Sequence, residues 1–178
     1  IAESTGKDCA GILPVINESI LEAVDYGRDR LFVYLRLVGD DNDATDEAIN
    51  ELQKLGHPTV RIDLKDRYDI GAEFFRWQFS TAVVGSMLTI QPFDQPNVQQ
   101  SKEETAHILK TYEATGCLPD AKSTEDVATL LAATKANDYV AILAYVDETQ
   151  EVGVALTDLR TRITKRYGIA TTVGYGPR

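Results

Sequence analysis

Glu18 stands where a charged group could take part in chemistry. It follows an apolar segment, residues 11–16, that is typical of a short strand. Open α/β sheets bind ligands at the carboxyl ends of their strands, and a carboxylate there could move a proton between neighbouring atoms of a substrate. The alternative is a solvated charge on an acidic surface, because glutamates are mostly exposed.

Lys102 shares a predicted helix face with apolar residues. If residues 97–114 form a helix, Val98, Lys102, Ala106 and Leu109 lie on one stripe, because their spacing follows the helical repeat. A lysine in an apolar stripe extends to solvent along its stem, pairs with an acid, or faces a cleft. Extension to solvent is the commoner outcome, and a role in a cleft is the alternative.

Two further segments contain polar residues that could bind a ligand. Gln95 lies between Pro92 and Pro96, which predict a turn, so it is either a polar turn residue or a binding residue. The segment Thr5-Gly6-Lys7 lacks the earlier glycine and the following Ser or Thr of a phosphate-binding loop. A nucleotide site is therefore not predicted there.

The histidines and cysteines predict neither a metal site nor a cofactor. Cys9 and Cys117 are too few for a disulfide framework and are not spaced as zinc ligands, so we expect two reduced thiols. His57 follows Gly56, where we expect it to support a turn before a strand. His107 lies next to the apolar stripe of its predicted helix.

The composition is that of an acidic globular protein. The 178 residues have a formal net charge of −10 at pH 7, with 43% hydrophobic and 26% charged residues. Nonspecific nucleic-acid binding needs a basic surface, and no such cluster stands out. The longest apolar run, residues 79–90, is shorter than the roughly 20 residues of a membrane span. We therefore expect no nucleic-acid partner, no membrane partner and a cytoplasmic location.

Hydrophobic periodicity predicts alternating strands and helices. The expected strands are 11–16, 30–38, 58–64, 139–146 and 169–175, and the expected helices are 43–55, 69–90, 97–114, 123–135 and 148–166. The helix at 69–90 is apolar nearly all round and is expected to be buried. Ser123 and Asp126 resemble a capping box. This order predicts an α/β three-layer sandwich with a five-stranded, mainly parallel sheet and 139–146 at its centre.

The segment from Gly85 to Lys102 resembles a signature of the glucose-6-phosphate isomerase family. That signature has a glycine, a short apolar run, Phe-Asp-Gln, a valine, and a lysine four residues later. The matching residues are Gly85, Met87, Leu88, Phe93, Asp94, Gln95, Val98 and Lys102. Asn97 departs from the signature, which has a small residue there; asparagine tolerates the left-handed conformation that such a turn requires.

The resemblance covers most of the chain. Residues 2–7, 68–77 and 138–177 resemble further family segments, and the last is most similar to the isomerase part of bifunctional transaldolase–isomerases. It implies a flavodoxin-like sugar-isomerase domain that interconverts glucose 6-phosphate and fructose 6-phosphate, in glycolysis and gluconeogenesis. It also implies that residues 1–178 are a single domain, the C-terminal part of a longer isomerase. The implied partners are the other isomerase half, a fused transaldolase domain and a second copy in a homodimer.

The resemblance implies roles for three side chains. Lys102 stands where the family's lysine assists opening of the sugar ring, and Gln95 matches a glutamine near the substrate phosphate. Glu18 stands at the family's base, although Asn17 and Ser19 replace the usual Gly and Pro. The family's catalytic histidine and Ser/Thr-rich phosphate loop have no counterpart here, so we expect the chain by itself to be inactive.

Two other functions remain open from the sequence. The same fold can serve as a non-catalytic module that binds sugar phosphates or mediates dimerisation, and such a module need not keep a carboxylate at position 18 or a lysine at 102. A flavodoxin-like nucleotide binder ranks last, because no Gly-rich loop follows a predicted strand.

Overall fold

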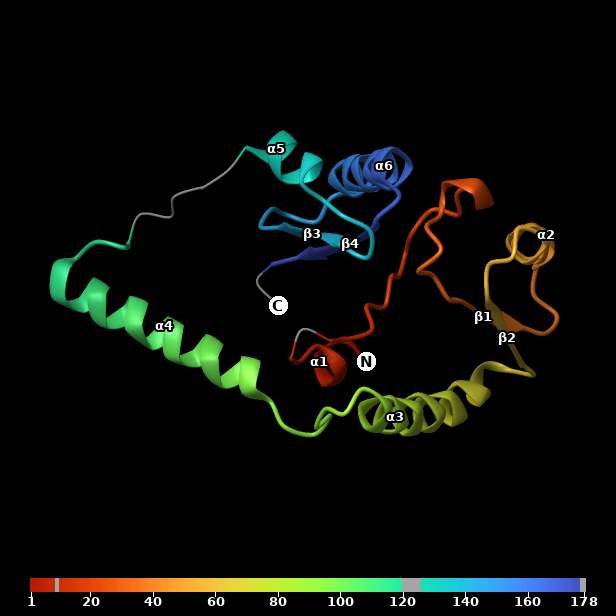
Figure 1. Cartoon of the computed structure of the whole chain (residues 1–178), viewed down its shortest axis with the longest axis horizontal. Helices are drawn as coiled ribbons and strands as arrows, with labels where there is room; N and C mark the ends of the chain where they lie inside the picture. Colours follow the sequence, from red (N-terminus) through yellow and green to blue (C-terminus); the bar gives the residue numbers. More distant parts are fainter. Residues whose placement is uncertain (9, 120–125, 177–178) are drawn as a thin grey trace. The chain divides into compact units, whose positions relative to one another are not determined.

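The computed structural model describes residues 1–8, 10–119 and 126–176 (Figure 1). The elements in chain order are α1 (Ala2–Thr5), a 3-10 turn (Ala23–Asp25), β1 (Phe32–Leu37), α2 (Asp43–Lys54), β2 (Thr59–Leu64), a 3-10 turn (Arg67–Asp69), α3 (Ile70–Met87), α4 (Pro96–Thr115), α5 (Val127–Ala132), β3 (Tyr139–Ala144), α6 (Gln150–Tyr167) and β4 (Ala170–Tyr175).

The chain divides into two compact units. The helical unit comprises Ile1–Pro14 and Ala72–Asp126, and the βαβ unit comprises Val15–Gly71 and Val127–Arg178. All four strands belong to the βαβ unit. Glu18 is part of the βαβ unit, whereas Gln95 and Lys102 are part of the helical unit.

The β1–α2–β2 motif pairs its two strands in parallel, from Phe32 opposite Thr59 to Leu37 opposite Leu64. Alternate side chains of a strand point to opposite faces. The face that carries Tyr34 meets α2, because the Tyr34 hydroxyl donates to Asn42 at the start of that helix, at 2.9 Å. On the other face, Val33, Leu35 and Val60 are exposed.

The β3–α6–β4 motif has the same construction. Its strands pair in parallel from Tyr139 opposite Ala170 to Ala144 opposite Tyr175. The helix begins at the Thr149 cap, whose side chain accepts a hydrogen bond from the Val152 N–H. It ends at Gly168, whose φ of 69° suits a residue without a Cβ.

The helical unit contains α1, α4 and nearly all of α3. Within α3 only Glu73 and Gly85 are buried, and a Cβ at Gly85 would lie 2.7 Å from Cγ of Pro92. Glycine is therefore required where the turn after α3 packs back on the helix. The helix α4 starts with Pro96, a favoured first residue, and has no buried residue.

The expected five-stranded sheet is wrong. Among the described residues the strands form two separate two-stranded parallel sheets, β1–β2 and β3–β4, so residues 139–146 contain a strand with one neighbour rather than a central one. Residues 11–16 form no strand, and Pro14 has no N–H to donate to a ladder. Periodicity identified the other four strands without specifying their partners, and pairing within one βαβ motif closes the shorter loop.

Two expectations about helices also need correction. The apolar helix α3 is not buried: Phe74, Phe75 and Phe79 are each more than half exposed. Asn97 is helical within α4 and not in a turn. The predicted capping box at Ser123 lies outside the described residues, and the described part of that helix is Val127–Ala132. No helix in the described part of the chain is long and apolar enough to cross a membrane.

Candidate functional site

Glu18 lies on an irregular segment of the βαβ unit that is bound by a helix far away in the sequence. The Arg160 side chain of α6 donates from Nη1 to the carbonyl oxygens of Ile16 and Asn17, at 3.0 Å each. Asn17 has a φ of 53°, a left-handed conformation that asparagine tolerates better than most residues. Two successive carbonyls can therefore face one guanidinium, and Glu18 follows directly.

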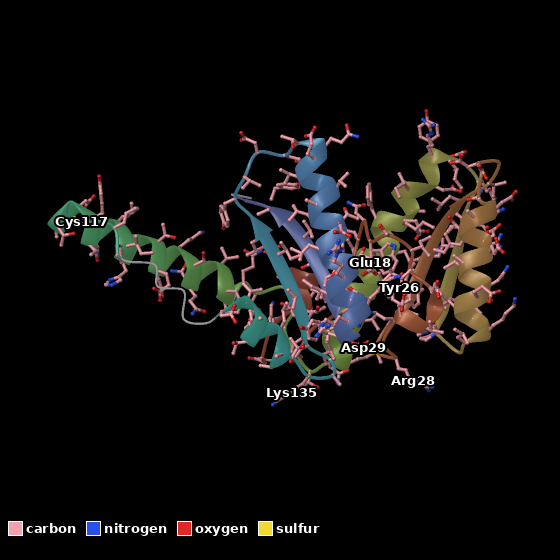
Figure 2. The ribbon with its side chains drawn as sticks, turned by 90° about the horizontal axis from the view of Figure 1, so that it is seen from above. Glu18, Tyr26, Arg28, Asp29, Cys117 and Lys135 are labelled. Atoms are coloured by element: carbon pink, nitrogen blue, oxygen red, sulfur yellow. The ribbon has the colours of Figure 1, made fainter. Side chains whose placement is uncertain are left out.

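The surroundings of Glu18 change its acidity. Its side chain is half-buried beside α6 and Tyr26 (Figure 2), and this desolvation raises its pKa. The positive charges of Arg160 and Arg30 act in the opposite direction and lower the pKa, but their effect is smaller. The net result is a carboxyl group that binds its proton more tightly than an exposed glutamate.

Tyr26 holds the far end of the same segment. Its hydroxyl accepts a hydrogen bond from the Leu21 N–H at 3.0 Å, and its ring packs edge-on against Phe32 at 4.9 Å between centroids. His57 packs edge-on against the Phe32 ring, and its Nε2 lies 2.9 Å from the carbonyl oxygen of Ala23. His57 therefore supports the segment at the start of β1 and β2. None of its contacts in the described part of the chain is with Glu18.

Arg30 contributes a donor near Glu18 that has no partner among the described residues. Its Nη1 pairs with the Asp29 carboxylate at 2.6 Å, while its Nη2 is buried without a hydrogen bond. Buried donors without partners are uncommon and costly. A half-buried carboxylate, a nearby tyrosine and an unsatisfied guanidinium nitrogen together could bind and deprotonate a hydroxylated anion.

The other two predicted site residues lie in the helical unit, on α4. Gln95 is exposed at the N-cap of α4, where its side chain forms no capping hydrogen bond. Lys102 is exposed two turns into the helix, and it forms no salt bridge within the described part of the chain. Their roles in substrate binding and ring opening stay predictions.

Lys7 has a role that the sequence did not reveal. Its side chain is 5% exposed and forms a salt bridge with Asp94, and its Nζ also donates to the carbonyl oxygens of Gln91 and Asp94. Asn97 donates to the carbonyl oxygen of Gly6 at 3.1 Å. The segment after α1 is thereby attached to the start of α4. Sequence spacing predicts contacts only between residues that are close in the chain. Lys7 and Asp94 are far apart in the sequence, so no sequence signal predicted this pair.

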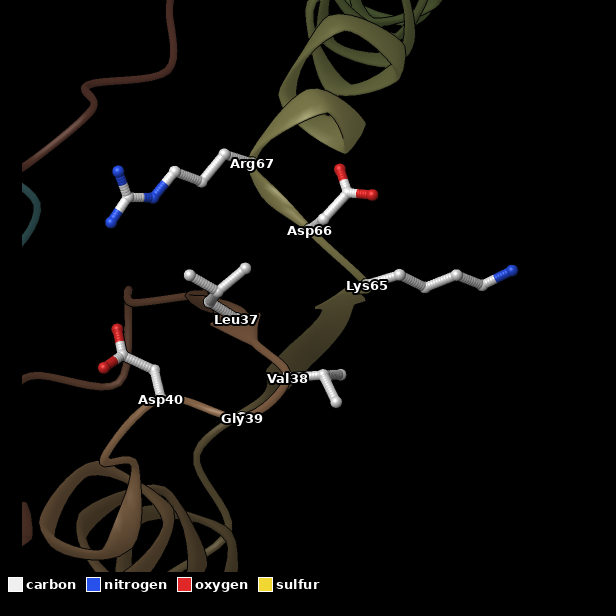
Figure 3. Close-up of a pocket in the computed structure, with 7 residues that line it drawn as sticks. All are labelled: Leu37, Val38, Gly39, Asp40, Lys65, Asp66 and Arg67. Atoms are coloured by element: carbon white, nitrogen blue, oxygen red, sulfur yellow. The ribbon is translucent and has the colours of Figure 1, made fainter.

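A shallow pocket lies at the carboxyl ends of β1 and β2 (Figure 3). Its lining residues are Leu37, Val38, Gly39, Asp40, Lys65, Asp66 and Arg67. Arg67 and Asp40 extend to the same side of the pocket, and Lys65 extends to the other side. The sequence signal for this pocket is the charged residues that follow two strands, Asp40 three residues after β1 and Lys65, Asp66 and Arg67 directly after β2.

The helical unit has a second, more apolar pocket. Its lining residues are Ile1, Ser4, Phe74, Trp77, Gln78, Thr81, Ala82, Pro92 and Phe93. Neither Gln95 nor Lys102 lines it. The turn that carries Phe93 therefore faces α3 and α1, while Gln95 lies at the N-cap of α4 and Lys102 lies within that helix.

The described residues contain no group of His, Cys, Asp and Glu that could hold a metal ion. Cys117 is exposed and free, and Cys9 lies outside the described residues. Comparison with known proteins adds no relative, because no protein-family model, no curated protein and no solved structure matches this chain significantly.

Proposed function

We propose that this chain is part of an isomerase that interconverts glucose 6-phosphate and fructose 6-phosphate, and that Glu18 is its base. The state of Glu18 carries this proposal. Its carboxyl group is half-buried, its pKa is raised by desolvation, and two arginines lie near it. Proton transfer is most efficient when the pKa of the base approaches the working pH, and the surroundings of Glu18 shift it in that direction.

The proposed step moves one proton between neighbouring carbons. In the open-chain aldose, Glu18 accepts the proton from C2 as the C2–H bond breaks and its electron pair moves through C1 to O1, which leaves the enediol as its anion. The same carboxyl group returns the proton to C1, and the hydroxyl proton on O2 moves to O1. The atoms balance without an oxidant, a metal or an organic cofactor. A single carboxylate suits both halves of this transfer because it acts first as base and then as acid.

The helical unit supports the proposal through two features of the motif. Gly85, part of the segment that resembles the family signature, is required for a physical reason: Pro92 leaves no space for a Cβ at this position. The segments 2–7 and 85–102, which both resemble the family, are joined by the Lys7–Asp94 salt bridge. We assign Lys102 to ring opening and Gln95 to the phosphate. The other isomerase half, a transaldolase domain, a homodimer and a cytoplasmic location belong to the same proposal.

The test is the variant Glu18→Gln in the longer protein that would contain this chain. It should lower kcat by about 10²–10⁴-fold, because a positioned proton shuttle contributes that much, while binding of fructose 6-phosphate should remain. Wild-type turnover of glucose 6-phosphate in deuterium oxide should place deuterium on C1 of the fructose 6-phosphate that forms. Asp46→Asn, in the β1–α2–β2 motif, is the matched control and should keep wild-type kcat. Unchanged kcat in Glu18→Gln would remove Glu18 from the mechanism, and binding without any wild-type turnover would favour the non-catalytic module.

The exposed lysine on α4 provides an independent test. Lys102→Ala should lower kcat less than Glu18→Gln, because ring opening is only one of two proton-transfer stages. Lys110→Ala on the same exposed helix is the control and should leave kcat unchanged. The 178-residue chain alone should show no measurable isomerase activity, since misplacing one reacting group by ~1 Å can cost about 100-fold. Robust turnover by this chain would contradict that expectation.

A further inference from the structure

Arg160 is a buried cation that forms no salt bridge with any residue the structure describes. It is 3% exposed. Burial of a charge without a direct ion pair is costly, and here four neutral oxygen atoms accept hydrogen bonds from the guanidinium. A surface arginine on the same helix, Arg162, instead pairs with Asp158 at 2.8 Å. The contrast indicates that Arg160 has a specific task inside the βαβ unit.

The strand β4 fixes one side of the guanidinium. Nη2 of Arg160 donates to the carbonyl oxygen of Thr171 at 2.7 Å, and Nε lies 3.3 Å from Oγ1 of the same residue. Oγ1 of Thr164 lies 3.3 Å from Oγ1 of Thr171, and both threonines are almost fully buried. The planar fork of arginine presents its donors in a rigid geometry, so anchoring two nitrogens on Thr171 fixes the direction of Nη1.

The free side of the guanidinium binds the segment before Glu18. Nη1 donates to the carbonyl oxygens of Ile16 and Asn17, which are 144 and 143 residues away in the sequence. We propose that Arg160 is the positioning residue of Glu18: by binding these two carbonyls it places the next residue's carboxyl group in its half-buried position. The role of Glu18 as a base rests on the proposed function, whereas its placement by Arg160 does not.

Charged groups on several elements face Glu18, and they make the inference testable. Arg160 on α6 and Arg30 before β1 lower its pKa, and Tyr26 lies near it as well. Desolvation raises the pKa and is the larger effect. If Arg160 acts only through its charge, its removal raises the pKa of Glu18 further. If Arg160 holds the segment in place, its removal lets the carboxyl group reach water, and the pKa falls.

Two substitutions separate charge from position. Arg160→Lys keeps the charge but cannot bind two carbonyls and Thr171 with a rigid fork, and Arg160→Met removes both. With ¹³C-labelled glutamate, NMR titration of the 178-residue chain should show the pKa of Glu18 falling toward its ordinary value of 4.5 in both variants. Amide hydrogen–deuterium exchange of residues 15–21 should accelerate in both. Arg162→Met is the control and should change neither quantity.

A variant on the segment itself covers the case in which Arg160→Met fails to fold. Asn17→Val disfavours the positive φ and should lower the pKa of Glu18 although Arg160 is intact, while Asn17→Gly should leave it unchanged. The inference is overturned if Arg160→Lys keeps the wild-type pKa and Arg160→Met raises it, or if Asn17→Val leaves it unchanged. None of these measurements uses isomerase activity, so failure of the proposed function would be seen separately.

Discussion

The β1–α2–β2 and β3–α6–β4 motifs both join two parallel six-residue strands through one helix, yet their interiors differ. The buried residues of the first motif are mainly apolar or aromatic, namely Tyr34, Leu52 and Leu64 with the polar Asn42. The second buries Ile163, Ile169 and Ala170 together with Arg160, Thr164 and Thr171. The same backbone arrangement therefore encloses two interiors of different polarity.

The polar contacts of the two motifs end in different places. In the first motif the Tyr34 hydroxyl donates to Asn42, and Asn42 donates to the carbonyl oxygens of Leu37 and Asp40, so the network satisfies itself. In the second, Arg160 donates beyond the motif to Ile16 and Asn17. Hydrogen bonds that stay within a motif stabilise that motif. The hydrogen bonds of Arg160 to Ile16 and Asn17 also fix the position of a segment outside its motif.

The largest expected effect concerns the apolar contacts. Leu52→Ala should lower the free energy of unfolding by about 3 kcal/mol, because it removes buried methyl groups and leaves a cavity. Ile163→Ala should have a similar effect in the second motif, and both are measured by urea denaturation. Only Ile163→Ala, next to Thr164, should also shift the NMR titration of Glu18. A shift of Glu18 in Leu52→Ala would show that the two motifs are not independent.

A smaller effect compares one hydroxyl from each motif. Tyr34→Phe and Thr171→Val each remove one buried hydroxyl from a hydrogen-bonded network, and each should lower the free energy of unfolding by about 1 kcal/mol. The titration of Glu18 should move only in Thr171→Val, because Thr171 orients Arg160. If the pKa of Glu18 were the same in Tyr34→Phe and Thr171→Val, the contact between β4 and Arg160 would have no effect on Glu18.

The smallest expected effect is on the pH dependence of stability, which should have opposite signs for Glu18 and for Asp46. Burial raises the pKa of Glu18, so its contribution to stability is present below its ordinary pKa of 4.5 and is lost as the pH rises through the raised value. A hydrogen bond from Arg36 lowers the pKa of Asp46, so that contribution is present above the ordinary pKa of 3.8 and is lost as the pH falls through the lowered value.

Urea denaturation between about pH 3 and about pH 7 measures both dependences. Glu18→Gln should be more stable than the wild type near neutral pH and should lose this advantage in acid. Asp46→Asn should be less stable than the wild type near neutral pH and should approach it in acid. If Glu18→Gln instead destabilises the chain at neutral pH, the carboxylate is bound by a partner rather than desolvated.

The elements were predicted better than their arrangement. The strands 58–64 and 169–175 and the helices 43–55 and 148–166 agree with β2, β4, α2 and α6 to within a few residues, because periodicity, caps and terminal glycines act locally. Residues 11–16 were predicted as a strand on apolar content alone. The carbonyl oxygens of Ile16, the last residue of this segment, and of Asn17 accept hydrogen bonds from a side chain on α6 instead of from a neighbouring strand.

The candidate site shows the same division. Residue type and position after an apolar segment singled out Glu18, and the resemblance singled out Lys102 and Gln95. Neither indicated Arg160, which in the sequence is one of several basic residues on an amphipathic helix. Lys7 was discounted as a phosphate-binding residue, and its salt bridge with Asp94 could not be predicted from residues that lie so far apart.

By itself, the sequence determined the four observed strands, the helices between them and the carboxyl group at position 18, because these depend on short-range periodicity and residue chemistry. The tertiary structure decided that the strands form two sheets, that Glu18 is half-buried with a raised pKa, and that its segment is held by Arg160. Those properties depend on which residues, distant in the sequence, lie close together in the fold. Burial and long-range hydrogen bonds exist only after the chain has folded.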